Sequence, residues 1–359
     1  KIKLNKILNN RDDLLKLLIK ELSLLKDKYF VKRKTKIIKN INIDKEIKTL
    51  NKQILDELIN KKTKILIDNK YYLRKIVHNN YKKNIEVENK FISNKSTYKF
   101  ICNIDKNLKI IGISSNGKII QIDWEKSINN DCKLDNKFLN NINPLDIINF
   151  HSILKNEENF LCILNNQGRF KKVKIDEDIY NSSRISSIIK IKEDNKIINS
   201  FISQQKDLLI ILTSIGRIFK YNLSNKFIPP SSKQAQGTIL SKLFPSEHII
   251  SCCKCKEKDN LIIASKKGLF FNINSSELYN AHESKLGYIN EKFKVKNDLL
   301  LKIFPQDNYC EIETNKDKFA RINFSKLSYS KKDLFDIPFL TLEKDEFITK
   351  ISYLEDLLD

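Results

Sequence analysis

The segment LIILTSIGRIFKY (209–221) decides the fold, because its pattern occurs three more times in the chain. It consists of an apolar run, a short polar stretch, a glycine, and a second run that mixes basic and apolar residues. The same template is present in IIGISSNGKIIQI (110–122), LCILNNQGRFKKV (161–173) and LIIASKKGLFFNI (261–273). Two such runs around a glycine-containing turn are typical of a β-hairpin. The sequence therefore predicts a chain of repeated hairpins.

The glycines of the four copies keep a nearly constant period, with spacings of 51, 48 and 52 residues: Gly117, Gly168, Gly216 and Gly268. The chain has only seven glycines, so four at one phase indicate a true repeat. Two degenerate copies, 65–76 and 311–322, extend the series, with Lys70 and Asp317 at the glycine position. Such turns require a positive φ, which glycine adopts freely and aspartate tolerates. We therefore expect the hairpin at Lys70 to be irregular.

Each repeat continues with a polar loop, another apolar run, a polar turn and further apolar residues. Examples are the segments 186–200, 237–251 and 338–352. About four strands per unit of ~50 residues, and six units in residues 63–359, predict an all-β, propeller-like array. Two unrelated β-sandwiches are the competing interpretation, which the constant period disfavours.

The residues before the repeats are predicted to be helical. Asn10 and the acidic Asp12 and Asp13 suit the first turn of a helix over residues 11–39. Its apolar residues recur at spacings of four, four, three and four: Leu14, Leu18, Leu22, Leu25 and Tyr29. This stripe fits either an amphipathic helix on a core or one helix of a coiled coil that seeks a second chain. Residues 40–62 read as a linker or insertion, with a weaker helix over 44–62.

Composition limits the function classes. Lys and Arg total 66 against 44 Asp and Glu, a net charge of +22 that attracts polyanions such as nucleic acids. The longest apolar run, 208–212, is far too short for a membrane span, and the first residues lack the apolar core of a signal peptide. The absence of methionine suggests a processed product or an excised fragment. We expect no membrane partner.

Seven cysteines, an odd number over a long chain, favour a reducing compartment. The cluster of Cys252, Cys253 and Cys255 holds a single C-x-x-C and reads as a buried strand, because a structural zinc site normally needs four ligands. The four histidines lie at isolated positions, and no glycine-rich phosphate loop is present. We therefore expect no metal, no cofactor and no catalytic residue in this chain.

Two phrases carry a resemblance to a known family. The repeat LTSIGRIFKYNL (212–223) followed by KQAQGTILSKLFPSEHIIS (233–251) resembles the C-terminal domain of the DNA gyrase A subunit and its topoisomerase IV counterpart. The segment Ile7–Ile37 resembles the end of the gyrase A coiled-coil arm, with Lys34, Thr35 and Ile37 in its closing basic phrase. Apart from residues 40–62, the resemblance covers nearly the whole chain.

This resemblance implies a six-bladed β-pinwheel behind the end of an arm helix, a non-catalytic module that binds and bends or wraps duplex DNA on a basic outer rim. It also implies three further partners or activities of an intact enzyme: the cleavage domain of the same subunit, a gyrase B subunit, and ATP hydrolysis. The DNA-cleaving tyrosine of the family lies upstream of the arm and is absent here. A/T-rich coding suggests an apicoplast or plastid, with a bacterial cytoplasm as the alternative.

The expected DNA path consists of the basic residues beside each hairpin turn, because duplex affinity comes mainly from phosphate neutralisation. These candidates are Arg74, Lys75, Lys118, Arg169, Lys171, Lys172, Arg217, Lys220, Lys266, Lys267, Lys318 and Arg321. Solvated charges without function are the alternative interpretation. In either case we expect these side chains to be exposed. Charge reversal at Arg169, Lys171 and Lys172 should therefore change stability by no more than about 0.5 kcal/mol.

The family carries a wrapping motif of glutamine, basic residues and glycines in the first blade's outer loop. The corresponding segment here, Asn79–Asn94, contains no glycine and no such motif. The nearest phrase lies in the fourth repeat, with Lys233, Gln234, Gln236 and Gly237. Its displacement leaves three functions open: gyrase-type wrapping, topoisomerase IV-like binding without it, and a propeller-type scaffold for protein interactions.

Overall fold

A computed structural model describes residues 10–31, 43–77, 91–92, 98–127, 130–136, 138–139, 141–154, 158–180, 186–189, 195–233, 235–281, 286–289, 298–306, 309–324 and 342–354. The chain divides into two units, Lys1–Lys52 and Gln53–Asp359. Helix α2 (Arg11–Tyr29) belongs to the first unit and has no buried residue. Its N-terminus forms as predicted, because the Asn10 side chain accepts a hydrogen bond from the Asp12 N–H at 3.1 Å.

Helix α2 is shorter than predicted. It ends at Tyr29 because Phe30 takes an extended backbone, and Lys26 and Lys28 supply the positive charge of the last turn. The predicted end, 32–39, lies outside the described residues. Helix α3 (Ile43–Asn60) follows. The apolar residues at its end pack against the β unit: Ile54, Leu55, Leu58 and Ile59.

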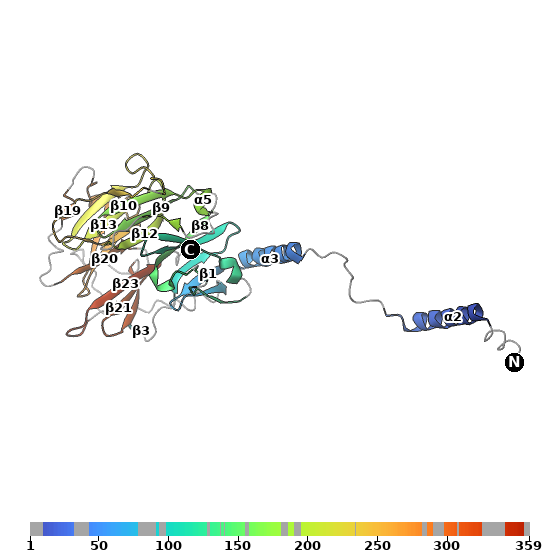
Figure 1. The fold of residues 1–359 in the computed structure, drawn as a ribbon. Helices are drawn as coiled ribbons and strands as arrows, with labels where there is room; N and C mark the ends of the chain where they lie inside the picture. Colours follow the sequence, from blue (N-terminus) through green and yellow to red (C-terminus); the bar gives the residue numbers. More distant parts are fainter. Residues whose placement is uncertain are drawn as a thin grey trace. The chain divides into compact units, whose positions relative to one another are not determined.

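Six antiparallel hairpins organise the second unit and define blades 1 to 6 (Figure 1). Their strands are β1 (Thr63–Asp68) and β2 (Tyr72–Val77), β5 (Leu108–Ser114) and β6 (Lys118–Ile122), β9 (Phe160–Asn165) and β10 (Arg169–Lys174), β13 (Leu208–Thr213) and β14 (Arg217–Asn222), β17 (Asn260–Ser265) and β18 (Phe270–Asn274), and β21 (Tyr309–Thr314) and β22 (Phe319–Asn323). Each hairpin copy predicted from the sequence is thus one blade.

Each blade also has an inner strand beside the first hairpin strand. These are β4 (Tyr98–Asn103), β8 (Ile147–Leu154), β12 (Ile197–Ser203), β16 (Ile249–Cys255), β20 (Leu300–Pro305) and β23 (Ile348–Leu354). Inner strands of successive blades contact one another, and β23 of blade 6 contacts β4 of blade 1. The six blades therefore form a closed ring with the inner strands at its centre.

The edge strand of a blade comes from the next blade's chain. After the hairpins of blades 1 to 5, a crossing segment returns to the preceding blade, pairs there over two residues, and then leads into its own inner strand. These edge strands are β3 (Phe91–Ile92), β7 (Cys132–Lys133), β11 (Ser186–Ser187), β15 (Thr238–Ile239) and β19 (Tyr288–Ile289). Because β3 follows the blade 1 hairpin and pairs with β22 of blade 6, it helps to close the ring.

Short helical turns lie in the crossing segments. They are η1 (Trp124–Ser127), η2 (Pro144–Asp146), α5 (Glu177–Tyr180) and η3 (Ser275–Glu277). Trp124 is buried in the core, and its indole N–H donates to the Leu108 carbonyl at 3.0 Å. No helix among the described residues is long and apolar enough to span a membrane.

The hairpin turns contain the expected positive-φ residues. All four repeat glycines have φ between 79° and 83°, and Asp317 has φ 55°. In blade 1 the positive-φ residue is Tyr71 (φ 62°), so the assignment of Lys70 to this position was wrong by one residue. The Asp68 carboxylate accepts hydrogen bonds from the N–H groups of Lys70 and Tyr72 at 2.9 and 2.8 Å, which stabilises a turn without glycine.

Apolar side chains fill the space between neighbouring blades. One cluster joins blades 3 and 4, another joins blades 4 and 5, and a third joins blades 5 and 6. Cys252, Cys253 and Cys255 are buried on β16, as the strand interpretation predicted. Burial raises the pKa of the Cys252 and Cys255 thiols to about 12. These cysteines are therefore unreactive core residues.

Polar side chains link successive inner strands. Asn149 Nδ2 donates to the Ser200 carbonyl at 2.9 Å, and Asn199 Nδ2 to the Cys252 carbonyl at 3.2 Å. In the same way, Lys302 Nζ on β20 donates to the Ile351 carbonyl on β23 at 2.6 Å. Because inner strands of different blades form no β-ladder with one another, these side-chain hydrogen bonds connect them.

Candidate nucleic-acid interface

The predicted cations lie on or beside the second strand of each hairpin, which is the strand that pairs with the edge strand where one is described. Crossing segments therefore cover part of this strand. Four of the cations are fully buried: Lys171, Lys172, Arg217 and Lys220. Their predicted exposure was wrong. Because these side chains are enclosed, we now expect charge reversal to be destabilising. The repeat pattern in the sequence does not show which residues of the next blade cover each hairpin strand, so it could not show which cations are buried.

The buried arginine of blade 4 is held by a carboxylate. Arg217 Nη1 lies 3.0 Å from Glu247 Oε2, and the guanidinium carbon lies 4.6 and 4.3 Å from the ring centroids of Phe219 and Phe244. Glu247 comes from the residues just before inner strand β16 of the same blade. An enclosed arginine with a carboxylate partner is a structural element and is not available to phosphate.

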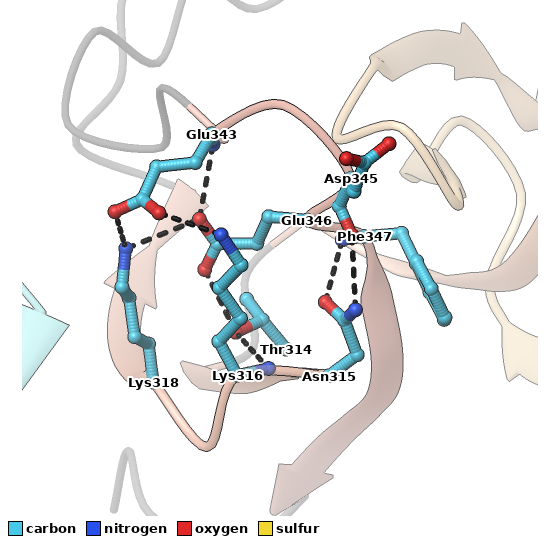
Figure 2. A network of polar contacts seen from close by, with 8 residues as sticks. All are labelled: Thr314, Asn315, Lys316, Lys318, Glu343, Asp345, Glu346 and Phe347. Carbon is cyan, nitrogen blue, oxygen red and sulfur yellow. Dashed lines mark hydrogen bonds and ion pairs between the residues drawn. The ribbon is translucent and has the colours of Figure 1, made fainter.

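Blade 6 repeats this arrangement at its surface, as Figure 2 shows. Lys318 Nζ lies 2.7 Å from Glu343 and 3.1 Å from Glu346, and Lys316 Nζ lies 2.6 Å from Glu343. Thr314 Oγ1 donates to the second oxygen of Glu346 at 2.9 Å. Hydrogen bonds from the two lysines lower the pKa of Glu343 to about 2. The cations of this turn are therefore neutralised within the protein.

The other cations differ in how much charge they offer. Lys118 and Lys267 are exposed, whereas Lys75 and Lys266 are half-buried. Arg74 is exposed but lies 3.3 Å from Asp68 and 3.6 Å from Asp131. Arg321 lies 3.8 Å from Glu311. The structure thus does not bring the predicted cations together as one continuous exposed path.

Arg169 and the motif-like phrase meet at blade 3. The phrase follows the blade 4 hairpin, but its continuation β15 pairs with β10 of blade 3. Arg169 Nη1 donates to the Gly237 carbonyl at 3.0 Å, and Lys233 Nζ lies 3.5 Å from Asp176. Gln236 is exposed, and Gln234 lies outside the described residues.

The crossing segment 223–248 of blade 4 is the most basic exposed surface that the structure describes on a crossing segment. Lys226 and Lys242 are exposed and Lys233 is half-buried, while the only carboxylate, Glu247, is buried with Arg217. Three large apolar side chains are also exposed here: Phe227 (46%), Ile239 (62%) and Phe244 (48%). The exposed lysines of this segment can contact a phosphate backbone.

Comparison with solved structures gives the fold. The C-terminal domain of DNA topoisomerase IV aligns with TM-score 0.62 and 12% identity, over 81% of this chain and 92% of that one. The C-terminal domain of DNA gyrase A aligns with TM-score 0.56 and 15% identity, over 81% and 99%. The chain is a six-bladed β-pinwheel. No protein-family model and no curated protein matches its sequence.

Sequence reasoning noted Lys233 and its neighbours on this crossing segment but missed Lys226 and Lys242, because the expected DNA path used only basic residues beside the hairpin turns. One signal was available: residues 223–246 contain three lysines and no acidic residue. The corresponding segment of blade 2, residues 123–146, has several exposed carboxylates, including Asp123, Glu125 and Asp131. Among the described residues, no group of three His, Cys, Asp or Glu side chains could hold a metal ion.

Proposed function

We propose that this pinwheel binds duplex DNA as a non-catalytic C-terminal module of a type IIA topoisomerase A-type subunit. The observation that carries the proposal is the shared six-bladed fold with two topoisomerase C-terminal domains, over at least 92% of each of them. A net charge of +22 supports a polyanionic partner. Duplex DNA needs no base-reading helix when phosphate contacts supply the affinity.

We place the DNA contact on the 223–248 segment and the adjoining face of blade 3. Lys226 and Lys242 offer charge that no described carboxylate of the segment neutralises, and Arg169 lies under the same surface. The exposed Lys118 on blade 2 is a further contact in this proposal. Lys318, Arg321 and Arg217 are poor candidates because carboxylates lie within 4 Å of them.

More specific parts of the proposed function rest only on the resemblance of the sequence to the gyrase A and topoisomerase IV C-terminal domains. They are DNA bending or wrapping, attachment to an upstream cleavage domain, and association with a gyrase B subunit. They also include an organellar or bacterial location. The absence of the wrapping motif from Asn79–Asn94 favours a topoisomerase IV-like role over gyrase-type wrapping.

A protein-interaction scaffold is the alternative, and one observation favours it. Tyr279, Leu286 and Ile289, on the crossing segment of blade 5, are 71%, 66% and 50% exposed. An apolar surface of this kind suits a protein partner better than a phosphate backbone.

Titration of the protein with duplex DNA over a salt series separates the two functions. DNA binding predicts a linear fall of log K with log salt, with a slope of about 0.9 per phosphate contact. The double variant Lys226→Ala/Lys242→Ala should reduce this slope by about two. Lys316→Ala, which removes a lysine paired with Glu343, is the matched control and should leave it unchanged. A shallow slope in the unmodified protein contradicts DNA binding.

A further inference from the structure

Two buried lysines on β10 hold the 223–248 segment from beneath. Lys172 Nζ donates to the Leu223 carbonyl, to Asn225 Oδ1 at 2.8 Å and to the Ile228 carbonyl at 3.2 Å. All three acceptors belong to the first residues of the segment. An ammonium group has three N–H donors, so these contacts occupy all of them.

Lys171 holds the next part of the same segment. Its Nζ donates to the carbonyls of Lys233 and Ala235 at 2.6 and 2.7 Å, and to the Ile188 carbonyl at 2.5 Å. Burial of this side chain lowers its pKa to about 8. Its three donors are also fully used, so neither lysine can reach a phosphate without breaking contacts inside the protein.

The contacts extend along the whole strand. The Ser231 N–H donates to the Lys172 carbonyl at 2.8 Å, and the Leu240 N–H donates to the Gly168 carbonyl at 3.0 Å. In addition, five of the six acceptors of the two lysines lie on residues 223–235. The segment has the composition of a loop, with Pro229 and Pro230 and no helix, so its shape depends on these anchors.

The acceptors are neutral, which has an electrostatic consequence. Five are main-chain carbonyls and one is an amide oxygen. Lys220, at the equivalent position of blade 4, instead shares its ammonium between the Ser275 carbonyl at 3.0 Å and Glu257 at 3.2 Å. Lys171 and Lys172 therefore share their ammonium groups with no described carboxylate at hydrogen-bonding distance, and they lie under a surface that also carries Lys226 and Lys242.

We propose that Lys171 and Lys172 are positioning residues, which fix the 223–248 segment in the shape that binds DNA without touching DNA themselves. This inference rests on the proposed DNA-binding function. It differs from the role predicted from the sequence, in which the same two lysines were direct phosphate contacts.

The test compares Lys171→Met and Lys172→Met, which keep much of the side-chain volume but remove the ammonium, with the control Lys220→Met. Amide hydrogen exchange of the free full chain should accelerate at least about tenfold at Ser231 and across 223–240 in the first two variants. Their affinity for duplex DNA should fall about tenfold. Lys220→Met should accelerate exchange near Ser275 and leave DNA affinity unchanged.

Each result decides one point. Unchanged exchange at 223–240 in both variants overturns the anchoring, and faster exchange with unchanged DNA affinity overturns the positioning role. If the unmodified protein binds no DNA, the proposed function fails while the exchange experiment still tests the anchor. If the methionine variants do not fold, two variants on the segment side test part of the anchor: Asn225→Ala removes the acceptor of Lys172, and Ser231→Ala removes the hydroxyl that donates to the Lys172 carbonyl at 3.2 Å. Each should show the same two effects to a smaller extent.

Discussion

A Cβ atom on Gly237 would lie 2.5 Å from the carbonyl oxygen of Phe170. Gly237 also has φ 79°, so both its space and its backbone conformation require glycine. Gly287 precedes edge strand β19 in the same way, and a Cβ atom added there would lie 2.9 Å from the Ile218 carbonyl oxygen. The two glycines are 50 residues apart and serve the docking of an edge strand. The close approach and the positive φ therefore explain why glycine occupies position 237, without any role in a DNA-wrapping motif.

Gly237→Ala should destabilise the protein by at least about 1 kcal/mol, because alanine is strained at this φ and its Cβ has no room. Urea unfolding measures the change. Gln236→Ala, at the exposed neighbouring position, should leave the midpoint unchanged. Unaltered stability of Gly237→Ala together with weaker DNA binding would instead support the wrapping-motif interpretation.

Removal of one partner of the buried ion pair should be costly. Glu247→Ala leaves the enclosed Arg217 charge without its carboxylate, so we expect a loss of about 3–5 kcal/mol in the free energy of unfolding. The double variant Arg217→Met/Glu247→Leu should recover much of this loss, because no buried charge remains. Equal destabilisation of both variants in urea would show that packing, not charge, dominates at this site.

Charge reversal separates buried from exposed cations of the original path. Lys172→Glu places a carboxylate among carbonyl oxygens and should cost more than about 3 kcal/mol, with loss of cooperative unfolding in the extreme case. Lys118→Glu changes an exposed side chain and should stay within about 0.5 kcal/mol of the unmodified protein. Thermal unfolding of both variants checks this, and similar midpoints would contradict the burial of Lys172.

His151 should make the protein acid-sensitive. Burial and the nearby Lys254 ammonium lower the pKa of His151 to about 3, and Nε2 lies 2.8 Å from Ser200 Oγ. Between about pH 3 and 6.5 the unfolded chain binds a proton at this histidine and the folded protein does not, so stability falls as pH falls through this range. The slope is at most about 1.4 kcal/mol per pH unit.

The variant His151→Gln removes the difference in proton binding between the folded and unfolded states at this position. The free energy of unfolding should therefore fall less steeply as the pH is lowered. Denaturant unfolding at pH 4, 5, 6 and 7 measures it. His248→Gln, at an exposed position, serves as the control and should follow the unmodified protein. Parallel curves for His151→Gln and the unmodified protein would assign the acid sensitivity to other groups.

Much of the architecture could be predicted because it follows from local patterns. Apolar alternation around Gly117, Gly168, Gly216 and Gly268 specifies hairpins, and a constant period specifies identical units that stack. Helix α2 was predicted correctly at its capped N-terminus but not at its end, where no glycine or proline marks a stop. The turn of blade 1 was misplaced by one residue because an aspartate, not a glycine, stabilises it.

The sequence by itself determined the six repeats, the β class, the apolar core positions and the strong positive charge. Each of these depends on residues close together in the chain. Only the tertiary structure decided which cations are available, because the covering segment comes from the next blade, about 50 residues away. Lys172 and Lys118 are both cations on the strand that follows an equivalent turn, four residues after Gly168 and one residue after Gly117. One is buried under residues 223–228 and the other faces solvent, since long-range packing controls exposure and local pattern does not.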